Sequence, residues 1–118
     1  MKSKNKDTGR HGEELAREYL QKKGLKILHT NWQIHNQGEI DIIAEQRNTL
    51  VFIEVKTRSS LDFGNPLEAI DNKKLEQMKK TALLFLSQNK KHYDNIRFDA
   101  VSILLKPEIK IYHLENIV

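Results

Sequence analysis

Residues 38–58 read GEIDIIAEQRNTLVFIEVKTR, and this stretch decides the fold. It contains two segments rich in β-branched residues on either side of a short polar stretch, a pattern typical of a β-hairpin. A tight turn centred on Arg47 and Asn48 fixes the pairing of the two strands. Asp41 is then predicted to lie opposite Glu54, and Glu39 opposite Lys56.

This register predicts a chemical site. Opposed residues of a hairpin share a face, with Cβ atoms about 4.5–5.5 Å apart, so two carboxylates and the Lys56 ammonium converge. Adjacent carboxylates repel one another unless a hard divalent cation such as Mg²⁺ or Mn²⁺ lies between them. Water held by such a cation is a nucleophile, which Lys56 can position or deprotonate while it neutralises charge on a phosphate. The alternative is a set of ion pairs on an exposed sheet, each worth about 0–1 kcal/mol.

Helix and strand patterns flank the hairpin on both sides. Expected helices cover residues 12–23 and a stretch from either Pro66 or Asp71 to Asn89; further strands are expected over residues 25–28, 96–105 and 109–114. The order strand, helix, strand favours a right-handed crossover that sets residues 98–104 parallel to residues 50–56. The expected fold class is α/β, with a mixed four- to five-stranded sheet flanked by helices.

Composition predicts one domain over residues 1–118, with a mobile basic arm at residues 1–11. The chain has 118 residues, 38% of them hydrophobic, and no Cys, which excludes a disulfide framework and Cys-ligated zinc. No apolar run approaches the ~20 residues that span a bilayer, so no membrane association is expected. The charged N-terminus lacks the apolar segment of a secretory signal, so the expected location is the cytoplasm.

The charge is distributed unevenly along the chain. The formal net charge is +4, yet residues 1–30 and 71–118 are basic while residues 31–70 are acidic. Basic flanks around an acidic centre are expected of a protein that binds a polyanion with a divalent cation at its centre. The alternative is that the lysines are simply solvated surface residues.

The motifs resemble a known family. Asp41 followed by Glu54-Val55-Lys56 looks like the D…(D/E)xK core of the PD-(D/E)XK nuclease superfamily, which includes restriction endonucleases and archaeal Holliday-junction resolvases. A wider set of residues resembles the bacterial YraN family of endonuclease-like proteins: Gly9, Gly12-Glu13, Ala16, Tyr19-Leu20, Gly24, Asn31, Gly38-Glu39-Ile40-Asp41, Glu54-Val55-Lys56, Arg58, Phe63-Gly64, Lys73 and Arg97-Phe98-Asp99. Ile40 stands where the superfamily name has proline.

The resemblance implies a restriction-endonuclease-like core and a specific site. Asp41, Glu54 and the backbone carbonyl of Val55 would hold Mg²⁺ or Mn²⁺, and Lys56 would be the catalytic lysine. Glu13, on the first helix, matches a further metal ligand, with Glu14 a weaker candidate. The residues expected to bind nucleic acid are Arg10, His11, Arg58 and Lys73.

The function hypothesis that follows is a metal-dependent endonuclease. DNA rather than RNA is its expected substrate, and branched or otherwise non-duplex DNA in particular. The alternative is a non-catalytic nucleic-acid-binding module of the same fold that acts with a partner enzyme. A third reading is a purely structural interaction domain. The resolvase-like resemblance also implies a homodimer, and the strand at residues 109–114 is the candidate to pair with a second subunit at a sheet edge.

Overall fold

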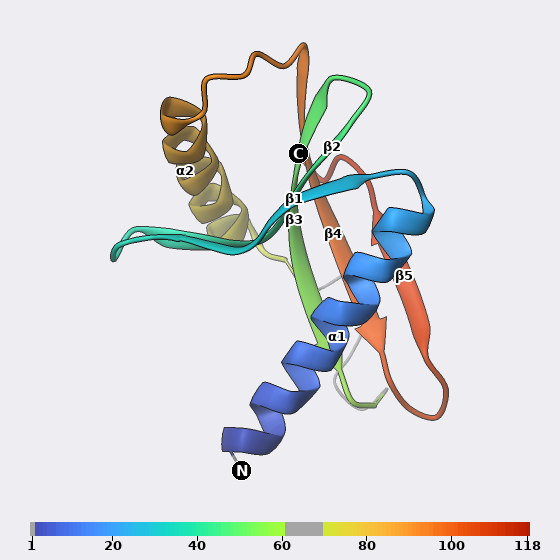
Figure 1. The fold of residues 1–118 in the computed structure, drawn as a ribbon. Helices are drawn as coiled ribbons and strands as arrows, with labels where there is room; N and C mark the ends of the chain where they lie inside the picture. The colour runs from blue at the N-terminus through green and yellow to red at the C-terminus, as the bar shows by residue number, and fades with distance from the viewer. Residues whose placement is uncertain (1, 61–69) are drawn as a thin grey trace.

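In the part of the chain that the structure describes, five strands form one mixed sheet, and one helix packs on each face of it (Figure 1). The computed structural model describes residues 2–60 and 70–118, with side chains described from Thr8 onward. In chain order the elements are α1 Lys2–Lys22, β1 Lys26–Ile34, β2 Gly38–Gln46, β3 Thr49–Arg58, α2 Asn72–Gln88, β4 Asn95–Leu104 and β5 Lys110–Leu114. The α/β prediction is confirmed, and the architecture is compatible with a restriction-endonuclease-like core.

The predicted hairpin is β2 and β3. Their ladder runs from Ile42 opposite Ile53 to Gln46 opposite Thr49, which is the predicted register. The two turn residues between them, Arg47 and Asn48, have φ values of 50° and 63°. Positive φ at both central residues is the type I′ geometry, whose twist matches that of the flanking strands.

The crossover prediction is also confirmed. β3 and β4 pair in parallel along their whole length, with Phe52 beside Phe98, and the sheet order is β1-β2-β3-β4-β5. α2 makes the connection between them. β5 lies at the sheet edge, where the sequence placed it.

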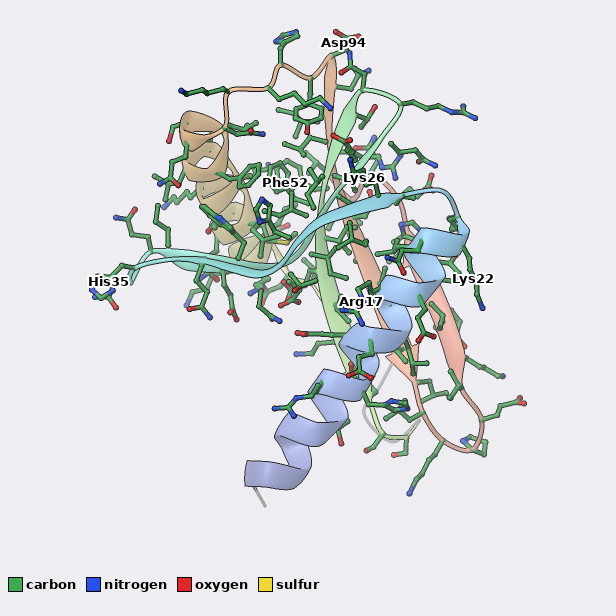
Figure 2. The ribbon with its side chains drawn as sticks, viewed as in Figure 1. Arg17, Lys22, Lys26, His35, Phe52 and Asp94 are labelled. Atoms are coloured by element: carbon green, nitrogen blue, oxygen red, sulfur yellow. The ribbon has the colours of Figure 1, made fainter. Side chains whose placement is uncertain are left out.

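The sheet separates two hydrophobic cores. The core under α1 contains Ala16, Leu20, Leu25, Ile42, Ala44, Val51, Ile53, Val55, Val101 and Ile103. The core under α2 contains Ile40, Ile43, Leu50, Phe52, Met78, Ala82 and Phe85. Phe52 points from β3 toward α2 (Figure 2). Because side chains alternate along a strand, Glu54 and Lys56 follow Phe52 on the α2 side of β3.

α1 is longer than the sequence indicated. It begins at Lys2 rather than at residue 12, so the segment predicted as a mobile arm at residues 1–11 is helical from Lys2 onward. The polar composition and two glycines hid this, because glycine inside a helix costs about 1 kcal/mol relative to alanine. Gly12 has a packing role: a Cβ there would overlap the Thr57 side chain, so its absence lets α1 approach β3 closely.

β1 is also longer than its predicted residues 25–28 and reaches Ile34. With β2 it forms a ribbon that projects past α2, with His35 near its tip (Figures 1 and 2). Trp32 packs on Phe85 with ring centroids 5.2 Å apart, so its ring lies against the core under α2. The polar residues around Trp32 lie in the strand because β2 supplies their backbone partners.

α2 begins after Asp71, one of the two predicted starts. The Asp71 carboxylate accepts a hydrogen bond from the Lys74 backbone N–H at 2.8 Å, which caps the helix. The alternative start at Pro66, and the motif residues Phe63-Gly64, lie outside the described residues. Among the described helices none is long and apolar enough to cross a membrane.

Candidate active site

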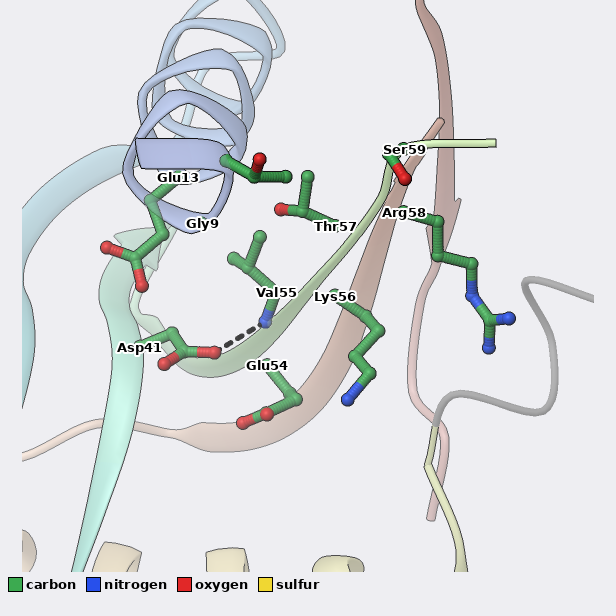
Figure 3. A pocket seen from close by; sticks show the side chains of 10 residues that line it. Gly9, Glu13, Asp41, Glu54, Val55, Lys56, Thr57, Arg58 and Ser59 are labelled. Carbon is green, nitrogen blue, oxygen red and sulfur yellow. Dashed lines mark hydrogen bonds between the residues drawn. The ribbon is translucent and has the colours of Figure 1, made fainter. Parts of the chain in front are cut away.

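The site lies where β2 separates from β3. The ladder between them ends at Ile42 and Ile53, and beyond it the Asp41 carboxylate takes the place of a backbone acceptor. Asp41 Oδ2 accepts a hydrogen bond from the Val55 N–H at 2.8 Å (Figure 3). In a strand the N–H and C=O of one residue point to the same side, so the Val55 carbonyl also faces the gap that β2 leaves.

Packing explains why the strands separate there. Ile40 and Ile43 both lie in the core under α2, whereas Ile42 lies in the core under α1. Strictly alternating side chains would put Ile40 and Ile42 on one face, so β2 changes the face it presents around Asp41. Gly38 allows the ribbon to approach α2, because a Cβ on this residue would overlap the Thr81 side chain.

One predicted pair is therefore wrong. Glu39 does not lie opposite Lys56, because by that point β2 has left β3 and follows β1. Glu39 instead lies opposite Gln33, whose Nε2 donates a hydrogen bond to the Glu39 carboxylate at 3.0 Å. The predicted meeting of Asp41 with Glu54 holds, although it is made by side chains beyond the end of the ladder.

The two carboxyl groups disturb each other strongly. The pKa of Glu54 is raised to about 7, first by burial and then by the negative charge of Asp41, and the Lys74 ammonium opposes the shift. Burial likewise raises the pKa of Asp41, against the hydrogen bond from the Val55 N–H. A hydrogen bond between the two carboxyl groups, which needs a proton, also raises the pKa of Glu54. The pair is thus held in an environment that disfavours two negative charges.

The pair opens onto a cleft of about 540 Å³ between α1 and β3 (Figure 3). Its walls are Thr8, Gly9, Glu13, Asp41, Glu54, Val55, Lys56, Thr57, Arg58 and Ser59. Glu13 reaches the cleft from α1 and accepts a hydrogen bond from Asn31 Nδ2 at 3.1 Å. Burial raises the pKa of Glu13, and the charges of Asp41 and Glu39 act in the same direction.

Only some of the residues predicted to bind nucleic acid line the cleft or the hollow beside it. Arg58 lines the cleft beside Lys56. Arg10 lines a smaller hollow of about 140 Å³ that also touches Glu13 and Asp41. His11 is exposed on α1 and lines neither hollow.

Lys73 does not face the carboxylates, and its neighbour does. Lys73 is exposed in the first turn of α2, whereas Lys74 Nζ lies 3.6 Å from Glu54 Oε1. The sequence offered a signal for this. With Asp71 as the helix cap, the backbone N–H of Lys74 donates to the cap, and the side chains of the consecutive helix residues Lys73 and Lys74 point in different directions. The doubled lysine alone could not decide between them.

The donor set can be tested for a divalent cation. Mg²⁺ is typically bound through one or two carboxylates with several waters, so Asp41, Glu54 and the Val55 carbonyl match its preference for oxygen ligands. Burial first, and then neighbouring negative charge, raise the pKa values of both carboxyl groups, and the Lys74 ammonium opposes these shifts only in part. Within the described residues no three His, Cys, Asp or Glu side chains group into a metal site, so Glu13 is beside the pair rather than part of one cluster.

A second buried acid was not given a role by the sequence. Asp99 on β4 is fully buried and accepts hydrogen bonds from Arg97 Nε and Nη2, each at 2.9 Å, and from the Asn116 N–H at 2.9 Å. His113 Nε2 lies 2.8 Å from its carboxylate. Lys23 can only donate to His113 Nδ1, at 2.9 Å, so Nε2 carries the proton toward Asp99. The groups that contact Asp99 come from β4 itself, from β5 and from the C-terminal segment.

Comparison with known proteins places this geometry in a family. Residues 12–103 match the model of the "Uncharacterised protein family UPF0102". The chain belongs to the UPF0102 (YraN) family. It is 44% identical over 113 residues to a UPF0102 protein of Syntrophomonas wolfei, an alignment that covers 95% of this chain and 97% of the relative. It is 44% identical over 114 residues to one of Dictyoglomus thermophilum, covering 97% and 96%.

A third UPF0102 protein, from Caldanaerobacter subterraneus, is 45% identical over 122 aligned positions, covering 98% of each chain. The expected family membership is thereby confirmed. The stretch matched by the UPF0102 model includes Glu13, Asp41 and Glu54-Val55-Lys56, whereas Arg10 and His11 lie before it.

Proposed function

We propose that this UPF0102 protein is a divalent-metal-dependent endonuclease that hydrolyses phosphodiester bonds of DNA. The observation that carries the proposal is the pair of half-buried carboxyl groups, Asp41 and Glu54, facing an open cleft beside Lys56. Structural carboxylates are normally paired or fully hydrogen-bonded when buried. A pair of carboxylates whose negative charge is only partly offset by a neighbouring cation, and which borders a cleft, has the character of a functional site.

The residues of the cleft suit this reaction. Asp41 on β2 is oriented by the Val55 N–H, and Glu54 is the residue before Val55 on β3, so both carboxylates belong to the sheet. When bound, Mg²⁺ or Mn²⁺ supplies Lewis acidity and an activated water. Lys56 is exposed on the α2 side of β3 and can bind the scissile phosphate or hold the attacking water. Arg58 adds positive charge on the same wall of the cleft.

The surrounding charges favour a polyanionic substrate. Four cationic side chains line the cleft or the hollow next to it: Lys56, Arg58, Arg10 and Arg17. The net charge of +4 acts in the same direction at long range. Branched or splayed DNA is the substrate to test first, because the β1–β2 ribbon borders the site at Asp41 and projects from the sheet, where it can contact a strand that leaves a duplex (Figure 1).

The test is cleavage of end-labelled DNA: a linear duplex, a single strand, a splayed fork and a four-way junction, each with Mg²⁺, Mn²⁺ or EDTA. Glu54→Gln and Lys56→Met should each lower the cleavage rate by about 10³-fold or more. Glu18→Gln, an exposed residue of α1, is the matched control and should cleave like the wild type.

Each outcome decides a question. Cleavage that needs the metal and is lost in both site variants, but not in Glu18→Gln, supports the endonuclease. Cleavage that persists in Glu54→Gln at the wild-type rate belongs to a contaminating nuclease. Salt-sensitive binding without products under any metal contradicts catalysis and identifies the non-catalytic nucleic-acid-binding module.

A further inference from the structure

Lys74 contacts the carboxylate pair from the side opposite the cleft wall formed by α1. Its Nζ lies 3.6 Å from Glu54 Oε1, with 30% of the Lys74 side chain and 13% of the Glu54 side chain exposed. The charge of Lys74 acts on Asp41 as well as on Glu54. Lys74 is therefore the cation that partly offsets the two carboxylates in the protein without metal.

The helix does not favour a lysine at this position. Lys74 lies in the first turn of α2, where the positive end of the helix dipole disfavours a cation. The neighbouring Lys73 is exposed, and the ion pair with Glu54 is made by Lys74. The favourable interaction of Lys74 comes from the carboxylates that it faces, and not from its own helix.

The contact is loose enough to be exchanged. A separation of 3.6 Å between Nζ and Oε1 is an ion pair rather than a hydrogen bond. The lysine side chain has a flexible four-carbon stem, so its ammonium can move while α2 stays in place. A divalent cation on Glu54 carries twice the charge of the ammonium and repels it from the shared carboxylate.

We propose that Lys74 is a substrate-phosphate-binding residue that Glu54 retains until a divalent cation takes its place. This inference rests on the proposed function. Once displaced, the ammonium remains tethered at the edge of the site, and the anionic oxygens of a nucleic acid backbone are its partners there. Metal loading and phosphate binding are therefore coupled through one side chain, so that the protein gains affinity for its substrate when the site is loaded.

The test compares Lys74→Met with Lys73→Met, which removes the same charge from the neighbouring, exposed residue of the same helix turn. Both variants are first checked for native folding by circular dichroism. Mn²⁺ binding is measured by calorimetry in the absence of nucleic acid. Binding of a fluorescent splayed DNA fork is measured in EDTA and in Ca²⁺ over a range of salt concentrations.

The expected results differ between the two variants. Lys74→Met should bind Mn²⁺ about five- to tenfold more tightly than the wild type, because no ammonium competes for Glu54, whereas Lys73→Met should change little. In Ca²⁺, Lys74→Met should bind the fork about five- to tenfold more weakly, with the salt slope reduced by about one. In EDTA its affinity for the fork should equal that of the wild type.

Three results overturn the inference. Unchanged Mn²⁺ affinity in Lys74→Met excludes the competition, and equal weakening of fork binding in EDTA and Ca²⁺ makes Lys74 an ordinary surface cation. Failure of the wild-type protein to bind Mn²⁺ overturns this inference together with the metal-dependent endonuclease. If the Mn²⁺ and fork results are as expected and no substrate is cleaved, the coupling stands and only catalysis fails.

Discussion

Two acidic sites lie on adjacent strands of the same sheet, and their surroundings shift the carboxyl pKa values in opposite directions. On β4, burial alone would raise the pKa of Asp99, but hydrogen bonds from His113, Arg97 and the Asn116 N–H outweigh it and hold that pKa below its usual range. On β3, burial and the charge of Asp41 raise the pKa of Glu54 to about 7, and Lys74 offsets them only in part.

The difference separates a structural charge from a functional one. Asp99 has donors on both carboxylate oxygens and no exposed surface, so it joins β4 to β5 and the C-terminal segment. Asp41 and Glu54 have fewer donors and border a cleft, so their oxygens remain available to a cation. Predictions that exchange or remove these charges test the contrast directly.

The largest expected effect is at Asp99. Asp99→Asn should lower the free energy of unfolding by about 3–5 kcal/mol, because Arg97 and His113 lose the buried charge that pairs with them. Urea denaturation followed by circular dichroism measures it. Asp94→Asn, an exposed residue just before β4, is the control and should stay within about 0.5 kcal/mol of the wild type. A loss below about 1 kcal/mol would show that the Asp99 cluster does not stabilise the fold.

The opposite sign is expected at Glu54. In EDTA at pH 8, Glu54→Gln should raise the free energy of unfolding by about 1–3 kcal/mol, because the variant removes a buried negative charge beside Asp41. The same urea titration measures it, with Glu76→Gln on the exposed side of α2 as the control. A destabilised Glu54→Gln would mean that the Lys74 ion pair, rather than the repulsion from Asp41, dominates this site.

Local signals in the sequence predicted much of this molecule. The turn at Arg47-Asn48, the cap at Asp71 and the meeting of Asp41 with Glu54 each follow from residues close together in the chain or from one hairpin register. The parallel pairing of β3 with β4 follows from the handedness of crossovers. These features need no knowledge of how distant elements pack.

The features that could not be predicted depend on packing between distant elements. β2 leaves β3 because Ile40 packs under α2. Glu39 therefore lies opposite Gln33 and not opposite Lys56, its predicted partner. Arg97 is a neighbour of Asp99 on β4, but His113 and the Asn116 N–H reach Asp99 from beyond that strand, so no spacing in the sequence revealed them. The choice of Lys74 over Lys73 depends on how α2 is placed against the sheet.

The pH dependence should separate the two acids by sign. At pH values between about 5 and 7 the folded protein retains a proton on Glu54 that the unfolded chain, with a pKa near 4.5, has released. The contribution of Glu54 to stability therefore falls as the pH rises through this range. Asp99, whose pKa is lowered from 3.8, contributes stability that is lost only in acid.

Urea titrations of the wild type and Glu54→Gln in EDTA at pH 5, 6, 7 and 8 measure this contribution as a difference. The two proteins should unfold with nearly equal free energies at pH 5 and diverge by about 1–3 kcal/mol at pH 8, with the variant more stable. Subtraction removes the titration of groups that the variants share. A difference that does not change with pH would mean that Glu54 keeps the same charge in both states throughout, contrary to its raised pKa.

The smallest effect tests whether the Asp41 and Glu54 carboxylates bind a cation. Addition of 10 mM Mg²⁺ should stabilise the wild type by about 1.4 kcal/mol if the dissociation constant is about 1 mM, because only the folded chain holds both carboxylates together. Thermal unfolding with and without Mg²⁺ measures it. Asp99→Asn should show the same increment from its lower baseline, since its carboxylate is not part of the cleft, whereas Glu54→Gln should show almost none. An equal increment in Glu54→Gln would place the bound Mg²⁺ elsewhere and remove the contrast between the two acidic sites.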